Sequence, residues 1–279
     1  MTTTSLAWAP IPLRPLVEAA VAAARADPRV VGLAVGGSAA DGVMDEFSDL
    51  DLVVVGRDED QLGLLRDAQV FAASLGPLLS AFTGEHIREP RLLLCLFGPP
   101  LVRVDLKFVA DQDLDHRVED GRIVWQRDGA LEAALRRSTA VWPSADPQWM
   151  EDRFWTWIHS GAAKVGRGEL FHCLEELAFL RRTIIGPLVS RSRGQRPNGV
   201  RRIEQIAPDL VPAMAATIGD HTALGCINAL RAAVDLYQRL RDASPDLMRR
   251  TGAEAAALAY LTEIEARLTR DGLGERRFR

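Results

Sequence analysis

The chain has 279 residues, of which 47% are hydrophobic and 26% charged, as in a globular protein of one large domain or two modest ones. Its formal net charge of −4 excludes a general electrostatic attraction to nucleic acid or to an anionic membrane surface. No apolar run reaches the roughly 18 residues that a membrane span needs. The three separated cysteines, Cys95, Cys173 and Cys226, fit neither a disulfide framework nor a zinc site. We therefore expect a soluble, cytoplasmic protein.

Helical and strand patterns alternate in the first part of the chain. The segment 13–26 is Ala-rich with apolar residues at helical spacing, and Asp27-Pro28 ends it. Strand patterns follow at 30–35 and 50–55, and a helical pattern follows at 58–75. Further strand patterns come at 78–82, 91–97 and 101–109, the last two joined by a turn at 98–100. These segments predict a small mixed β-sheet with flanking helices.

From residue 146 onward the strand patterns stop. Helical patterns predict five long helices, at 147–166, 168–189, 207–218, 221–243 and 248–270. The segment 139–148 contains two prolines and small polar residues, which are typical of a linker. We therefore expect an α+β protein with two domains, a mixed-sheet domain at 1–142 and an all-α helical-bundle domain at 143–279.

A Gly-Gly-Ser turn follows the first predicted strand. Gly36 and Gly37 allow the backbone to approach a ligand closely, and the amides at the start of a following helix can hold phosphate oxygens. Ser38 has an alternative interpretation as an ordinary helix N-cap. Neither the dinucleotide-binding pattern GxGxxG nor the P-loop pattern is present.

Three aspartates interrupt the strands that surround them. Asp49 and Asp51 are at alternate positions, so both side chains project from the same face at the start of the 50–55 strand. Asp105 interrupts the apolar run LVRVDLKFV, and it completes the set if its strand neighbours the 50–55 strand. Adjacent carboxylates repel one another unless a cation lies between them, and Mg²⁺ prefers such oxygen ligands. The alternative for Asp105 is an ion pair with Arg103 or Lys107 on the same strand face.

The motif GS, ten intervening residues, then DLDL and a distant third acid resembles the nucleotidyltransferase superfamily that includes DNA polymerase β. The resemblance covers about 13–125. A minimal domain of this kind followed by helices, with the run FWTWIHSGAAKVGRGELFHCLEELAFLRR at 154–182, is similar to the aminoglycoside and lincosamide nucleotidyltransferases, which inactivate antibiotics.

The resemblance implies a chemical role for each residue of the motif. A nucleoside triphosphate, expected to be ATP, would bind with Mg²⁺, its phosphate oxygens held by Gly37 and Ser38. Asp49 and Asp51 would ligate metal. Asp105 would ligate the second metal, serve as the general base toward the attacking hydroxyl, or do both, and pyrophosphate would leave.

The helical half offers further candidates. Lys164 resembles the cation with which this family reaches the triphosphate, or it stabilises a helix C-terminus. Glu175 and Glu176 are either exposed helix residues, or one of them is an acceptor for a substrate amine or an accessory base. The segment 181–202 holds seven arginines, which bind an anion such as pyrophosphate or RNA or else form a solvated loop, namely Arg181, Arg182, Arg191, Arg193, Arg196, Arg201 and Arg202.

We expect an Mg²⁺-dependent adenylyltransferase that transfers AMP from ATP to a hydroxyl of a small molecule, an aminoglycoside-like or lincosamide-like antibiotic. An acidic chain agrees with a cationic acceptor and argues against a polymerase, which needs a basic template channel. Two alternatives stay open, namely transfer to a protein or RNA acceptor and a non-catalytic nucleotide-binding module. The sequence also leaves open whether the protein is a homodimer.

Overall fold

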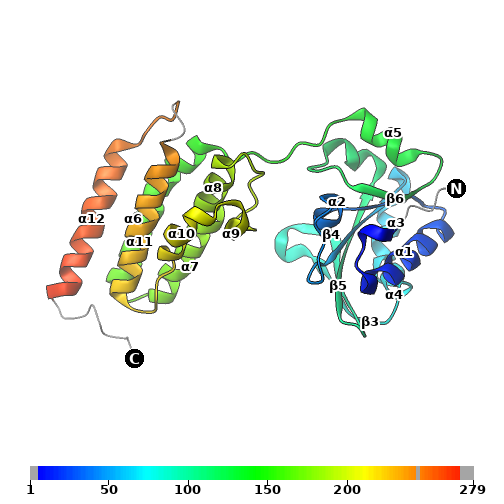
Figure 1. Ribbon diagram of the computed structural model, residues 1–279, viewed down its shortest axis with the longest axis horizontal. Helices are drawn as coiled ribbons and strands as arrows, with labels where there is room; N and C mark the ends of the chain where they lie inside the picture. Colours follow the sequence, from blue (N-terminus) through cyan, green and yellow to red (C-terminus); the bar gives the residue numbers. More distant parts are fainter. Residues whose placement is uncertain (1–5, 243–245, 271–279) are drawn as a thin grey trace. The chain divides into compact units, whose positions relative to one another are not determined.

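The chain divides into two compact units, Met1–Trp142 and Pro143–Arg279. The computed structural model describes residues 6–242 and 246–270 of them (Figure 1). The first unit is a mixed sheet with helices, and the second is entirely helical, so the predicted α+β class is confirmed. Among the described helices, none combines the length and the apolar character that crossing a bilayer requires.

The first unit is built on a six-stranded sheet with the order β3-β4-β5-β2-β1-β6. Its β2 and β5 strands are parallel, and every other neighbouring pair is antiparallel. The strands are β1 (Val30–Val35), β2 (Leu50–Gly56), β3 (Leu78–Gly84), β4 (Glu89–Phe97), β5 (Val102–Ala110) and β6 (Arg122–Gln126). The parallel pair matters for the site, because it places the starts of β2 and β5 side by side.

One face of the sheet carries most of the core of this unit. Alternate residues of β2, such as Leu52 and Val54, pack with Leu106 of β5 and with Val17 of α1. Helices cover this face, namely α1 (Arg14–Ala26), α3 (Gln61–Arg66) and α4 (Ala68–Ala73). The intervening positions of β2 and β5 therefore point to the opposite face.

The opposite face is only partly covered. A small apolar cluster there joins Ala34, Val55 and Val109 to Leu131 of α5 (Ala130–Arg137). The short helices α2 (Gly37–Ala40) and η5 (Asp111–His116) follow β1 and β5. The remaining turns of 3-10 helix in this unit are η1 (Leu6–Trp8), η2 (Ile11–Leu13), η3 (Asp58–Asp60) and η4 (Glu85–Ile87).

Several expectations for this unit need correction. The helical pattern at 58–75 is divided among η3, α3 and α4, because the chain leaves helical geometry at Asp67, where φ is −93° and ψ is 6°. Strand β6 and helix α5 were not predicted at all. The sequence of β6, RIVWQ, lacks the apolar alternation that marks the inner strands, and Val124 is the one buried residue of this strand.

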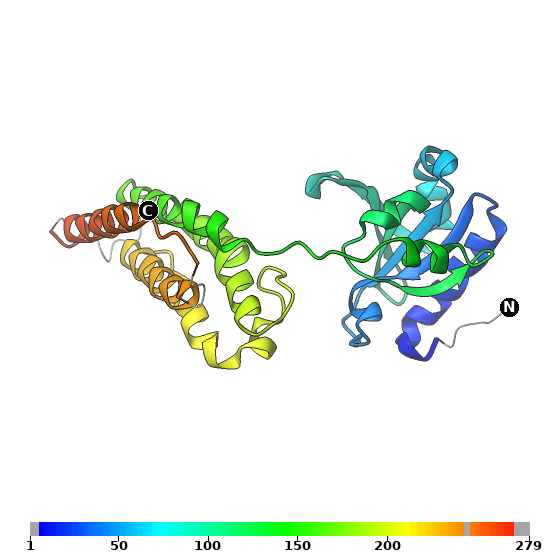
Figure 2. The same ribbon diagram turned by 90° about the horizontal axis from the view of Figure 1, so that it is seen from above.

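The second unit is a helical bundle (Figure 2). Its long helices are α6 (Pro147–Gly166), α7 (Leu170–Leu180), α11 (Ala223–Arg241) and α12 (Thr251–Arg270), and Figures 1 and 2 both show α12 running along α6. The shorter segments are α8 (Gly186–Ser192), α9 (Ile203–Ile206), η7 (Pro208–Leu210) and α10 (Val211–Ala216). The predicted helix at 147–166 matches α6 at both ends.

The predicted helix at 168–189 is continuous but not uniform. A π-helical segment, Arg181–Ile185, joins α7 to α8. Pro187 has no N–H group for the helical ladder, so a local change of winding near it is expected. Gly186 also lies so close to the carbonyl oxygen of Gly199 that a β-carbon would not fit there.

A buried acid organises the core of the helical bundle. Glu151 on α6 is fully buried and accepts hydrogen bonds from Trp155, from the Tyr237 hydroxyl and from the backbone N–H of Arg250. It also pairs with Arg241 on α11, at 3.2 Å. Burial alone would raise the pKa of Glu151, but these donors outweigh it and hold the pKa below its usual range.

Candidate active site

Three carboxylates meet at the start of the parallel strand pair. Asp51 on β2 is directly opposite Asp105 on β5 in the parallel register, and Asp49 lies two residues before Asp51. One oxygen from each of the three side chains can be chosen so that all lie within 4.8 Å of one another. The pairing of β2 with β5 therefore brings the three predicted acids together.

Strand alternation explains why these side chains share one face. Leu50, Leu52 and Leu106 point into the helix-covered core, so Asp51 and Asp105 must point to the opposite side. Asp105 is the most enclosed of the acids, with 7% of its surface exposed, whereas Asp49 and Asp51 are half-buried. A set of hard oxygen donors this close together has the chemistry of a divalent-cation site of the Mg²⁺ type.

The Gly-Gly-Ser turn lies against the same acids. Gly37 has a φ of +54°, and a β-carbon there would lie less than 3.0 Å from Oδ2 of Asp51. Glycine at this position thus allows the backbone to approach the carboxylate. Ser38 is 4% exposed and lies inside α2, and the N-cap is Gly36. The alternative interpretation of Ser38 as the N-cap is therefore wrong.

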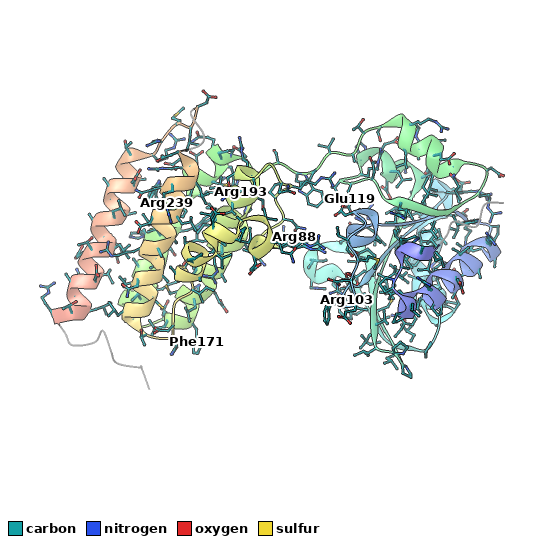
Figure 3. All side chains as sticks on the ribbon, viewed as in Figure 1. Arg88, Arg103, Glu119, Phe171, Arg193 and Arg239 are labelled. Atoms are coloured by element: carbon teal, nitrogen blue, oxygen red, sulfur yellow. The ribbon has the colours of Figure 1, made fainter. Side chains whose placement is uncertain are left out.

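A fourth acid, which the sequence did not reveal, reaches this turn. Glu119, which Figure 3 labels, lies in the loop after η5. It accepts a hydrogen bond from the backbone N–H of Gly37 at 3.0 Å. Its Oε1 would also lie 3.1 Å from a β-carbon on Gly36. Because Glu119 is far from the turn in sequence and lies in a loop without periodicity, no pattern pointed to it.

Arg103 holds Asp105 with two bonds. Its Nε donates to Oδ1 at 2.9 Å and its Nη2 donates to Oδ2 at 2.6 Å, while Nη1 lies 4.0 Å from Asp49. The hydrogen-bonded carboxylate raises the pKa of the Arg103 guanidinium above its usual value. The ion-pair alternative for Asp105 is thus present with Arg103, but not with Lys107, whose Nζ pairs with Glu89 at 3.0 Å.

The cationic candidates of the helical unit have partners inside that unit. Lys164 on α6 contacts the carboxylate of Glu176 on α7 and donates to the Ser160 hydroxyl at 2.8 Å. Of the arginines at 181–202, several bind within the same unit, namely Arg181 to the Thr217 carbonyl, Arg191 to the Ala145 carbonyl and Arg193 to Asp209. The sequence could not show that Glu176 faces Lys164, although one helical connection separates them.

Comparison with known proteins supports the interpretation of the first unit. Residues 18–87 match the family model of the nucleotidyltransferase domain, a segment that includes the Gly-Gly-Ser turn, Asp49 and Asp51. No curated protein sequence matches the chain. The predicted resemblance of this unit to nucleotidyltransferases is confirmed.

Two solved structures are similar to the chain along most of its length. An aminoglycoside 6-adenyltransferase from Bacillus subtilis is 11% identical, with 89% of this chain and 97% of that chain covered and a TM-score of 0.41. A nucleotidyltransferase-like protein from Exiguobacterium sibiricum is 14% identical, with 92% of each chain covered and a TM-score of 0.38.

The site and the family match fall in the same unit. The mixed sheet brings the three carboxylates together beside the glycine turn, and the segment that holds the turn matches the nucleotidyltransferase domain. The first unit therefore contains a nucleotidyltransferase domain.

Proposed function

We propose that the protein is an Mg²⁺-dependent adenylyltransferase that transfers AMP from ATP to a hydroxyl group of a small molecule in the cytoplasm. The observation that carries the proposal is the convergence of Asp49, Asp51 and Asp105 within 4.8 Å beside a close-approach glycine. Arg103 compensates the charge of Asp105, but three carboxylates held this close gain nothing from packing, and metal-assisted phosphoryl transfer uses such a set.

Each residue has a defined part in this reaction. Asp49 and Asp51 would hold the metal, and Asp105 would either complete that set or take the proton of the attacking hydroxyl. A bound Mg²⁺ would neutralise phosphate charge and acidify the hydroxyl, so that a base of ordinary carboxylate strength suffices. The Ser38 hydroxyl would orient the phosphate oxygens, and the Gly37 amide would do so once it is released from Glu119. Catalysis by this chain would thus consist mainly of positioning and charge neutralisation.

Arg103 adds a feature to the proposal. Arg103 takes one acceptor site on each oxygen of Asp105, and a carboxylate has about four such sites, so a metal or the acceptor hydroxyl can share the carboxylate with the guanidinium. The guanidinium would then lie next to the phosphates, where its planar donors suit phosphate oxygens. Lys164 is a weaker candidate for binding the phosphates, because its ammonium group is already paired with Glu176.

The acceptor we propose is an antibiotic of the aminoglycoside or lincosamide type. The family resemblance of the two-part layout supports this choice. The test is pyrophosphate release from ATP and Mg²⁺ across aminoglycosides, lincosamides, tRNA and buffer alone.

Two variants make this test specific. Asp49→Asn removes one proposed metal ligand, and Glu46→Gln removes an exposed acid of the same loop as a matched control. Acceptor-dependent release that Asp49→Asn abolishes and Glu46→Gln preserves would support the proposal. Equal release from both variants would contradict it.

A further inference from the structure

A cavity of about 340 Å³ adjoins the carboxylate cluster on the same face of the sheet. Val53 and Val55 follow Asp51 at alternate positions of β2, and Val109 follows Asp105 on β5. The parallel register pairs Asp51 with Asp105 and Val55 with Val109. The acids and the valines of the cavity floor therefore lie on the same face of this strand pair, one after the other along the strands. Side chains on one strand face repeat about every 7 Å, which places the cavity next to the reacting groups.

The walls of the cavity are mainly apolar. Nine of the sixteen lining residues are aliphatic or alanine, and they come from the sheet, from η5 and its following loop and from α5: Ala34, Val53, Val55, Val109, Leu114, Val118, Ile123, Leu131 and Leu135. Several of them, including Val53, Ile123 and Leu135, are only half-buried. The cavity is within the size range of pockets that hold small molecules.

The charged lining residues already have protein partners. Arg91 pairs with Glu89 at 2.8 Å and with Asp113 at 3.1 Å, and Arg117 pairs with Asp120 at 2.6 Å. Lys107 also pairs with Glu89. The hydrogen bonds of these groups are therefore used inside the protein, and the cavity has little to offer a phosphate.

The charge of the lining also disfavours a polycation. Three cationic side chains line the cavity, Arg91, Lys107 and Arg117, against two anionic ones, Asp113 and Glu119. A sugar bearing several ammonium groups would lose its hydration here against valine and leucine side chains. The acids of the lining are already bound, Asp113 to Arg91 and Glu119 to the Gly37 N–H.

Glu119 connects the cavity to the reaction site. Its side chain lines the cavity, and its carboxylate accepts the Gly37 N–H at the turn that faces Asp51. A molecule seated in the cavity could therefore extend past Glu119 and present a hydroxyl to Asp105, while its body stays on the aliphatic floor.

We propose that this cavity binds the apolar body of the hydroxyl acceptor. The acceptor is then a compound with an aliphatic ring or alkyl chain and at most one positive charge, rather than a polyamine sugar. This inference rests on the proposed transfer to a small-molecule hydroxyl and narrows its substrate class.

The first test is binding, followed by methyl NMR of the isoleucine, leucine and valine side chains. The probe is lincomycin, which carries an alkyl chain and several hydroxyls, added with Mg²⁺ and an ATP analogue whose α,β bridge is methylene. We expect the methyl signals of Val53, Ile123 and Leu135 to shift. Val53→Thr exchanges a methyl for a hydroxyl in the wall, so the dissociation constant of lincomycin should rise roughly tenfold.

The matched control is Val31→Thr. Val31 packs against the same small apolar cluster but does not line the cavity, so this variant should bind lincomycin like the wild type. Shifts caused by the ATP analogue alone, with none added by lincomycin, would overturn the inference in favour of a nucleobase pocket. Equal shifts with kanamycin, a polyamine sugar, would overturn it as well.

A parallel assay of pyrophosphate release separates this inference from the proposed function. If lincomycin shifts the cavity methyl signals but causes no pyrophosphate release, the proposed transfer to this compound is contradicted and the binding pocket is supported. If kanamycin causes pyrophosphate release that Val53→Thr does not change, the transferase reaction is supported and the assignment of the cavity to the acceptor is contradicted.

Discussion

Replacing Gly37 with alanine tests how the glycine turn serves the carboxylate cluster. Gly37 has a φ of +54°, a conformation that costs an alanine about 1 kcal/mol. The new β-carbon would also lie less than 3.0 Å from Oδ2 of Asp51. Because that oxygen is the end of a side chain, the Asp51 carboxylate has to rotate away from the new β-carbon. It then no longer lies beside Asp105.

Gly42→Ala is a matched control in the same loop. Gly42 has a φ of +71°, but a β-carbon there would meet nothing within 4 Å. Both variants should therefore lose about 1 kcal/mol of unfolding free energy in urea titrations. Only Gly37→Ala should lose about 100-fold in pyrophosphate release and bind Mn²⁺ more weakly by calorimetry. If both variants retain the same activity, Gly37 does not secure the position of Asp51.

Three other changes probe separate contacts. Arg103→Met removes the cation that occupies Asp105, so Mn²⁺ affinity measured by calorimetry should rise about fivefold; weaker binding would contradict this. Arg91 and Lys107 lower the pKa of Glu89 to about 2, so Glu89→Gln should cost about 1 kcal/mol at pH 7. That loss should shrink as pH falls from 4.5 toward 2, and a pH-independent loss in urea unfolding would refute it. Tyr237→Phe leaves buried Glu151 short of a donor, so thermal unfolding should show a loss of about 1–3 kcal/mol, absent with a half-buried control, Tyr260→Phe.

The sequence was informative where local pattern and structure coincide. The strands at 30–35 and 50–55 are apolar and bounded by glycine and polar residues, and the structure has strands at both places. Asp49, Asp51 and Asp105 stood out because a charge inside an apolar strand has no local explanation. Their meeting depended on one strand pairing that the sequence could only propose, and the parallel register of β2 and β5 supplies it.

Features set by distant partners were not predictable. Strand β6 is held at the sheet edge by its pairing with β1, although its own sequence is largely polar. Glu119 reaches Gly37 from a loop, and Lys164 is neutralised by Glu176 on the next helix. In each case the decisive contact joins residues on different elements of the fold, so only tertiary structure reveals it.

The pairing of β2 with β5 also has a consequence for how the protein becomes competent. Asp51 lies on β2 and Asp105 on β5, and the helices α3 and α4 and the strands β3 and β4 lie between them in sequence. The carboxylate cluster is therefore not assembled until β2 and β5 have paired. Non-local pairings of this kind close slowly during folding. A divalent cation that needs both carboxylates would bind only the completed sheet and would stabilise it by mass action. The gain in melting temperature on adding Mg²⁺ would then report on assembly of the sheet itself, before any substrate is present.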